Sequence, residues 1–240
     1  MTYVEGFVAP VHTDNREGFI AHTHLMAPFF TEFGASRTVD TIGDDVPAGK
    51  VTDFARSVQA SSDEIVSFGF VEYADRATRD AANQRMMNDP RMGEMPDMPF
   101  DGRRMIFSGF EAVVDQGPGG SPTYLDGFVG AVPTVNRDKF IVHATEAAPI
   151  FLAEGALRVV ECWGDDVSRG KVTDFWRAVK AEDGETVIFS WIEWPDKATR
   201  DAGMRAVELN MDSWMRDHPM PFDAQRMIFG GFEVVKDQKT

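Results

Sequence analysis

The stretch GDDVPAGKVTDF, residues 43–54, returns as GDDVSRGKVTDF at residues 164–175. The same offset of 121 positions relates YVEGFV at residues 3–8 to YLDGFV at residues 124–129. This period is far longer than that of a solenoid repeat, which spans about 20–50 residues. Each copy instead has the size of an ordinary domain. The chain is therefore expected to contain a duplicated domain.

A segment rich in glycine and proline separates the two copies. The sequence QGPGGSPT, residues 116–123, disfavours both helix and strand. We therefore expect a first repeat over residues 1–116, a linker over 117–123 and a second repeat over 124–240.

Within the first copy, the hydrophobic pattern predicts the order βαββαβ of a ferredoxin-like domain. The expected strands cover residues 3–11, 36–43, 64–72 and 103–114, and the expected helices end at Gly34 and span 76–88. Asp75 has the chemistry of an N-cap for the second helix. Pro28 and its counterpart Pro149 lie inside the first helix of each copy. A proline there predicts a kink or a break.

The predicted strands are apolar on both faces. Over residues 64–72, Phe68 and Phe70 point to one face while Ile65 and Val71 point to the other. A sheet with one wet face would instead alternate apolar with polar residues. Because helices can cover one face, the other face needs a second sheet. We therefore predict an α+β fold in which two ferredoxin-like βαββαβ repeats pack sheet to sheet, related by a pseudo-two-fold axis within one chain.

The composition argues against two classes of partner. The net charge is −15, which disfavours binding to nucleic acid or to an anionic membrane surface. No apolar run approaches the roughly 20 residues of a membrane span. The N-terminal residues carry no basic region of the kind that opens a signal peptide.

The single cysteine of the sequence, Cys162, cannot form an internal disulfide, which is typical of a reducing compartment. We expect this thiol to be buried and inert, and the protein to be cytoplasmic. Because the two copies are expected to pair within the chain, we also expect a monomer.

Five strings of sequence occur in the same order in both copies. They are Y-x-x-G-F-V, G-A-x-R-x-V, G-D-D-V-x-x-G-K-V-T-D-F, A-T-R-D-A and M-P-F-D-x-x-R-M-I-x-x-G-F. With these strings the chain resembles the YbaA-like family of small bacterial proteins, which have one repeat each and no established function. That family is similar to the dimeric α/β-barrel superfamily, whose members pair two ferredoxin-like sheets. The resemblance therefore implies that the two repeats form an intrachain pseudo-dimeric α/β barrel. The superfamily includes heme-handling proteins, cofactor-free monooxygenases and muconolactone-isomerase-like enzymes, so the resemblance implies a fold and leaves the function open.

His22 and its counterpart His143 are the candidate catalytic residues. Both lie at the edge of the apolar stripe of the first helix, where helix and sheet are expected to meet. Histidine titrates near neutral pH, so either imidazole could act as an acid or base in that cleft. The alternative is a half-buried histidine that forms an ordinary hydrogen bond.

Charged residues at predicted strand ends are candidate ligand-binding residues. They are Arg37, Arg104, Glu72 and their counterparts Arg158, Arg226 and Glu193. An arginine there could bind a carboxylate ligand in a bidentate manner. The alternative is an internal ion pair that ties strand ends together, for example between Arg104 and Glu72.

A charged turn could suggest a cation site or a carboxylate pair. It contains Asp44-Asp45, Lys50 and Asp53, copied as Asp165-Asp166, Lys171 and Asp174. Neighbouring aspartates on a strand point to opposite faces, so we expect backbone turn chemistry and no metal. No P-loop, nucleophile elbow or dinucleotide fingerprint is present in the sequence, and we expect no cofactor.

Three functions therefore remain open at this stage. The leading one is binding of a small molecule in the cleft between the first helix and the sheet. The second is a cofactor-independent monooxygenase- or isomerase-like enzyme that uses His22 or His143. The third is a structural or interaction module without a ligand.

Overall fold

The computed structural model describes residues 2–240, and of residues 210–213 it describes the backbone. The first repeat contributes the strands β1 (Tyr3–His12), β2 (Arg37–Asp45), β3 (Glu64–Tyr73) and β4 (Ile106–Gln116). Its helices are α1 (Arg16–Phe33), α2 (Phe54–Ser57) and α3 (Arg76–Asn88).

The second repeat has the same order of elements. Its strands are β5 (Tyr124–Pro133), β6 (Arg158–Asp166), β7 (Glu185–Trp194) and β8 (Ile228–Lys239). Its helices are α4 (Arg137–Ala153), α5 (Phe175–Ala178) and α6 (Lys197–Asp217).

Across residues 2–240, eight antiparallel strands form one closed barrel. Their order is β1-β3-β2-β8-β5-β7-β6-β4, and β4 pairs back to β1. Each repeat supplies four neighbouring strands, in the order β4-β1-β3-β2 or β8-β5-β7-β6. The fold is thus an α+β barrel.

The two four-stranded sheets differ from the expected face-to-face layers in one respect. Their edges are hydrogen-bonded to each other, β2 to β8 and β4 to β6. Unpaired edges would expose backbone donors and acceptors, and closure removes both edges of each sheet. The inner faces therefore meet inside a barrel and not between two separate sheets.

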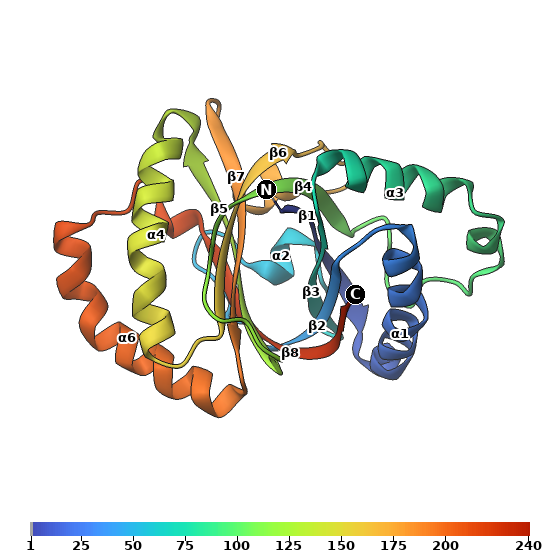
Figure 1. The fold of residues 1–240 in the computed structure, drawn as a ribbon, viewed down its shortest axis with the longest axis horizontal. Coiled ribbons are helices and arrows are strands. Elements are labelled where there is room, and N and C mark those ends of the chain that lie inside the picture. Colours follow the sequence, from blue (N-terminus) through green and yellow to red (C-terminus); the bar gives the residue numbers. More distant parts are fainter. Residues whose placement is uncertain (1) are drawn as a thin grey trace.

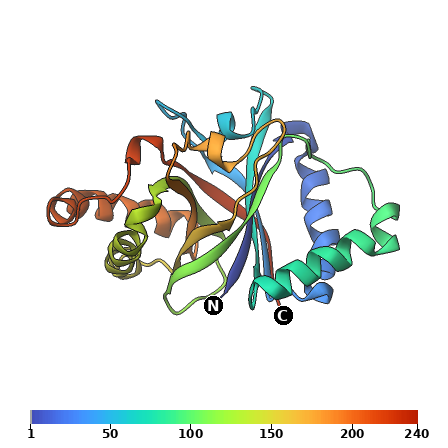
Figure 2. The same cartoon turned by 90° about the horizontal axis from the view of Figure 1, so that it is seen from above.

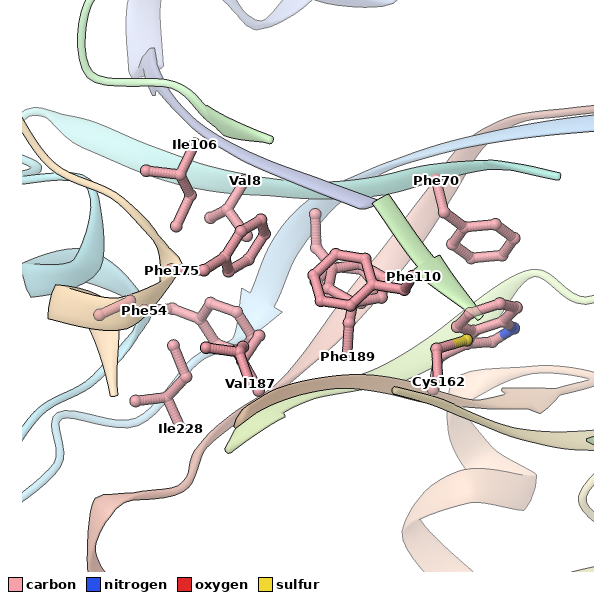
Figure 3. Close-up of a cluster of buried hydrophobic side chains, with 14 of the residues drawn as sticks. Val8, Phe54, Phe70, Ile106, Phe110, Cys162, Phe175, Val187, Phe189 and Ile228 are labelled. Atoms are coloured by element: carbon pink, nitrogen blue, oxygen red, sulfur yellow. The ribbon is translucent and has the colours of Figure 1, made fainter. Parts of the chain in front are cut away.

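Aromatic side chains fill the barrel interior (Figure 3). The Phe68 and Phe189 rings stack with centroids 4.6 Å apart, and Phe70 stacks on Trp191 at 3.9 Å. Cys162 lies buried in the same cluster, where desolvation raises the pKa of its thiol. The interior is a packed core rather than a ligand cavity.

Helices cover the outer surface of the barrel on two opposite sides. Helices α1 and α3 pack on one side and α4 and α6 on the other (Figures 1 and 2). Asp75 accepts a hydrogen bond from the Thr78 backbone N–H, so it caps α3 as the sequence predicts. None of the helices in the described part of the chain is long and apolar enough to cross a membrane.

The prolines inside α1 and α4 do not break these helices. Helix α1 runs without interruption through Pro28, and α4 runs through Pro149. Of the predicted kink or break, the break is therefore wrong. Packing of the apolar side of each helix against the barrel offsets the lost hydrogen bond.

The repeated GKVTDF segments close one end of the barrel. Asp53 accepts a hydrogen bond from the Arg56 backbone N–H and thereby caps α2, and Asp174 caps α5 in the same way. Thr52 donates to the Ala178 carbonyl across the repeats at 2.7 Å. The reciprocal bond, from Thr173 to the Ser57 carbonyl, is also 2.7 Å long. The shared string of sequence therefore joins the two repeats.

Candidate functional site

A cavity of about 140 Å³ lies between α1 and the outer face of the first repeat's strands. We call it the α1 cavity. Strands β1, β2, β3 and β4 form its floor, and α1 with Phe100 forms its roof. Its lining residues are Glu5, Phe7, Ala9, Phe19, His22, Thr23, Met26, Phe30, Asp40, Val71, Phe100, Met105 and Phe107.

Aromatic rings make up much of the wall of the α1 cavity. Phe100 packs edge-on against Phe19 with ring centroids 6.2 Å apart, and against His22 at 5.9 Å. The preceding carbonyl, that of Pro99, accepts a hydrogen bond of 2.9 Å from the Asn15 side chain. The Asn15 side chain makes no capping hydrogen bond to α1 and instead fixes Phe100 over the cavity.

Asp40 is the buried acid of this cavity. It is 8% exposed, and its register partner on β3 is Gly69, which offers no side chain. Within residues 2–209 and 214–240, no group forms a hydrogen bond or an ion pair with its carboxyl. Burial raises the pKa of Asp40 to about 7, and the positive charge of Lys236 on β8 opposes this effect only in part.

Two hydroxyl groups near Asp40 also have no partner. The Oγ1 of Thr38 and the Oγ of Ser67 are buried without a hydrogen bond to any residue that the structure describes. Thr38 pairs in register with Val71, and Ser67 pairs with Ala9. Register partners share a face of the sheet, so both hydroxyls lie beside the cavity floor. Buried polar groups normally find partners, which makes these two hydroxyls beside Asp40 unusual.

The second repeat has partners or apolar residues at the matched positions. Glu161 stands where Asp40 stands, and Ser190 on the adjacent strand donates a hydrogen bond to it. Val159 and Ile188 replace the two unpartnered hydroxyl residues. Burial raises the pKa of Glu161 to about 7, and the hydrogen bond from Ser190 opposes this shift.

Larger side chains also occupy the space beneath α4. Trp163 replaces Ile42 and packs against Phe140, with ring centroids 5.8 Å apart. Ile188 belongs to the same buried cluster. The outer sheet face of the second repeat is therefore better filled and better hydrogen-bonded than that of the first.

Glu5 is the second acid that lines the α1 cavity. Its carboxylate accepts hydrogen bonds from Asn83 at 2.9 Å and from Arg79 at 3.3 Å, both on α3. Arg79 also binds Asp166 of the second repeat at 2.7 Å. Glu5 is thus held in place and neutralised, whereas Asp40 is not.

The two candidate histidines lie in different surroundings. His22 lines the α1 cavity, and burial lowers the pKa of its imidazole. His143 instead borders an open groove of about 600 Å³ between α4 and residues 218–221, and its ring lies 4.9 Å from that of Trp214. Burial, followed by the nearby His218, lowers the pKa of His143. The structure therefore brings His22, and not His143, into a cavity with an unpartnered acid.

Four of the candidate ligand-binding residues form a cluster at the barrel end opposite α2 and α5. Arg37 donates to Glu193 at 2.5 Å, and Arg158 donates to Glu72 at 2.7 Å. Each arginine therefore binds the glutamate of the other repeat. Although an open basin of about 470 Å³ borders this cluster, further acids, Asp237 and Asp115, occupy the remaining donors.

The other two candidate arginines also form internal ion pairs. Arg104 binds Glu64 at 2.6 Å and Asp101 at 2.8 Å, so the pairing with Glu72 suggested by the sequence is wrong. Glu72 lies at the far end of β3 from Glu64, out of reach of Arg104. Arg226 repeats the arrangement with Glu185 at 2.6 Å.

The paired aspartates bind across the repeats rather than to their own turns. Asp44 accepts hydrogen bonds from Lys197 at 2.7 Å and from the Tyr124 hydroxyl at 2.9 Å. Asp165 accepts from Arg76 at 2.8 Å in the reciprocal position. The expected backbone turn chemistry therefore does not hold Asp44 and Asp165, whereas Asp53 and Asp174 of the same turns do accept backbone hydrogen bonds. Nowhere in the described residues do three His, Cys, Asp or Glu side chains lie close enough to hold a metal ion.

Sequence reasoning missed Asp40, Glu5, Thr38 and Ser67. Asp40 interrupts the apolar run RTVDTI of β2, and Glu161 interrupts the matched run RVVECW. An acid at the same place in two apolar strands was the available signal. Whether such an acid has a partner depends on the adjacent strand, because Gly69 and Ser190 differ across the two copies.

Solved structures of low sequence identity share this fold. A proposed monooxygenase from Fusobacterium nucleatum has a TM-score of 0.59 and 9% identity, covering 100% of this chain and 94% of that one. A proposed monooxygenase from Lactobacillus acidophilus has a TM-score of 0.55 and 7% identity, covering 99% and 96%. An anthrone oxidase-like protein has a TM-score of 0.54 and 11% identity, covering 99% of this chain and 92% of that one. At such identities the likeness shows the fold alone.

A sequence relative corresponds to one repeat. The uncharacterized protein YbaA of Escherichia coli (strain K12) is 52% identical over 117 residues, which are 48% of this chain and 98% of YbaA. The model of the DUF1428 family, described as a protein of unknown function, matches twice, over residues 2–102 and 123–224. The chain therefore belongs to the DUF1428 family and carries two copies of its domain in tandem.

Proposed function

We propose that the first repeat binds a small organic molecule in the α1 cavity. The observation that carries this proposal is the carboxyl of Asp40, buried at the cavity floor without a partner among the described residues. An unpartnered buried acid lowers the stability of the fold, and such groups concentrate at functional sites. A ligand that hydrogen-bonds to Asp40 would remove this penalty.

The second repeat supplies the design of the test. Replacing Ala9 by Gly and Ser67 by Ile reproduces in the first repeat the pair Gly130 and Ile188 of the second. We expect this double variant to fold, because the second repeat already accommodates the pair, and to lose the ligand site. The control is Phe229→Ala, which truncates an exposed side chain of the second repeat.

The experiment is a fragment screen by thermal shift and by NMR on the full chain. A fragment present at 100 times its Kd adds about 2.7 kcal/mol to the free energy of unfolding. Fragments that bind the natural chain and the control but not the double variant support the proposal. Binding that persists in the double variant, or a screen without any binder, contradicts it, and the latter result favours a structural module.

The second candidate function is a cofactor-independent enzyme of the monooxygenase or isomerase type. It is favoured by the pKa of Asp40, which lies near neutrality and suits a general base, and by the fold shared with proposed monooxygenases. His22, on the opposite wall, would be the second proton-transferring group. Turnover of any bound fragment should then fall at least about 100-fold in Asp40→Asn, while Glu161→Gln retains it.

We further propose that the chain is a fused pseudo-dimer that works as a cytoplasmic monomer. Reciprocal bonds at both barrel ends, such as those of Arg37 and Arg158, support an internal pairing of the repeats. Within residues 2–240, closure of the barrel leaves no free sheet edge for a further partner. Sedimentation at micromolar concentration checks this assembly, and a dimer mass contradicts it.

A further inference from the structure

We propose that the ligand of the α1 cavity is a small organic cation, an amine with an apolar body, whose ammonium group binds the Asp40 carboxylate. This inference rests on the proposed function and narrows it to one class of ligand. It follows from the aromatic rings, the charges and the size of the cavity.

The aromatic wall suits a cation. Five phenylalanine side chains line the cavity, and they come from β1, α1, β4 and the loop before β4: Phe7, Phe19, Phe30, Phe100 and Phe107. The face of an aromatic ring attracts a positive charge, and this attraction grows when the cation is shielded from water. Phe107 is 60% exposed, so its ring stands at the mouth of the cavity.

The charged groups of the wall are acidic. Among the residues that line the cavity, the ionisable ones are Glu5, His22 and Asp40. Arg79 neutralises Glu5, and the pKa of His22 is lowered by burial, which favours its neutral form. Lys236 is the cation that acts on Asp40, yet it makes no ion pair with it within the described residues. The negative charge left without a direct partner is that of Asp40.

The carboxylate of Asp40, unpaired among the described residues, favours a positively charged ligand over a negative or neutral one. A carboxylate ligand would meet two acids, and a neutral ligand would leave the ionised Asp40 without a counter-ion. An ammonium group supplies both the hydrogen-bond donors and the opposite charge. Because burial raises the pKa of Asp40 to about 7, amine binding should strengthen as the pH rises through this value.

The size of the cavity limits the apolar body. A cavity of about 150 Å³ lined by apolar side chains holds one benzene molecule. The α1 cavity has about 140 Å³ and opens past Phe107, so it fits one ring with a short tail. Benzylamine is therefore a suitable probe, with benzyl alcohol and benzoate as its neutral and anionic counterparts.

The test is a titration of the full-length chain with these three probes, at pH 8 and at pH 5.5, followed by NMR. At pH 8 we expect benzylamine to bind about tenfold more tightly than benzyl alcohol, and benzoate most weakly. At pH 5.5 this preference should shrink to less than about threefold, because Asp40 is then protonated. Asp40→Asn should show the smaller preference at both pH values.

Two further variants complete the design. Lys236→Met removes the charge that competes for Asp40 and should strengthen benzylamine binding about threefold at pH 8. Glu161→Gln changes the matched acid of the second repeat and should leave the preference intact. Equal binding of all three probes overturns the inference and leaves the proposed function standing, as does a preference that survives Asp40→Asn. Absence of binding by every probe overturns both.

Discussion

Asp40 and Glu161 occupy matched positions on β2 and β6, yet the residues beside them on β3 and β7 differ. Ser190 lies beside Glu161 in the strand register and donates a hydrogen bond to it. Gly69 occupies the same place beside Asp40 and has nothing to donate. A Cβ atom on Gly69 would overlap the ring of Phe7, which lines the α1 cavity. The packing of the cavity wall thus keeps Asp40 without the partner that Glu161 has.

Replacing Ser190 by Ala should leave Glu161 as unpartnered as Asp40. We expect the free energy of unfolding at pH 8 to fall by about 1–3 kcal/mol, the desolvation penalty of a buried group that loses its hydrogen bond. At pH 5, where Glu161 is protonated, the loss should be smaller. Urea unfolding at both pH values measures it, and an unchanged stability at pH 8 would contradict the assignment.

Replacing Asp40 by Asn should change how stability depends on pH. The pKa of Asp40 is raised in the folded chain to about 7, so the folded state holds more protons than the unfolded state between about pH 4 and pH 7. Stability contributed by this group is therefore present at low pH and is lost as the pH rises through about 7. Between pH 5 and pH 8, ionisation of Asp40 should lower the unfolding free energy of the natural chain by roughly 2–4 kcal/mol. Asp40→Asn should lack this decrease.

The measurement for Asp40→Asn is the difference in unfolding free energy between variant and natural chain from pH 5 to pH 8. The comparison with the natural chain is needed because the lowered pKa values of His22 and His143 make stability rise with pH, opposite to the effect of Asp40. If the two chains keep a constant difference over this range, the raised pKa of Asp40 is wrong.

Loss of a buried ion pair at the barrel end, such as that of Arg37 with Glu193, should lower the free energy of unfolding strongly. Arg37 and Glu193 have side chains that are 5% and 0% exposed. Arg37→Met removes the closer of the two arginines that pair with this buried acid, since Arg158 lies at 3.4 Å, and should lower the unfolding free energy by about 3–5 kcal/mol. The control is Arg16→Met, because Arg16 pairs with Glu233 at 2.8 Å in a more exposed position and should contribute about 1 kcal/mol or less. If Arg37→Met and Arg16→Met lower the free energy of unfolding in urea by the same amount, this prediction is wrong.

The packed barrel interior gives a further prediction. Phe189 is fully buried and stacks on Phe68, so Phe189→Ala should destabilise the fold by about 3–5 kcal/mol. Phe229→Ala removes the same group from an exposed site and should change stability by about 0.5 kcal/mol. A small effect at Phe189 would mean that the interior is open, and the ligand site would then have to be sought there.

The strands and the long helices could be predicted from local pattern and from the repeat, and the barrel from the resemblance to the YbaA-like family. Asp75 caps α3 as expected, and the two-sided apolar pattern around Phe68 and Phe70 reflects a strand buried inside and out. The exact closure could not be predicted. It depends on edge pairing between β2 and β8 and between β4 and β6, which lie far apart in the sequence.

The site was harder to predict because the partners of its charged residues depend on contacts between strands. Arg104 pairs with Glu64 rather than Glu72, since barrel geometry places it at the start of β3. The aspartates of the repeated turn bind across the repeats for the same reason. The helical pattern was enough to place His22 near the cavity. That Asp40 lacks a hydrogen-bond partner among the described residues could be seen only from the strand register, which places Gly69 beside it.

The most direct measurement is the pKa of Asp40 in the full-length chain, from the pH dependence of its side-chain carboxyl carbon in NMR spectra. We predict a midpoint at about pH 7, which moves to lower pH when benzylamine is added. A midpoint near 4, the ordinary value of an aspartate in water, would show that this carboxyl already has a partner or is solvated. The proposed site would then lose the residue on which it rests.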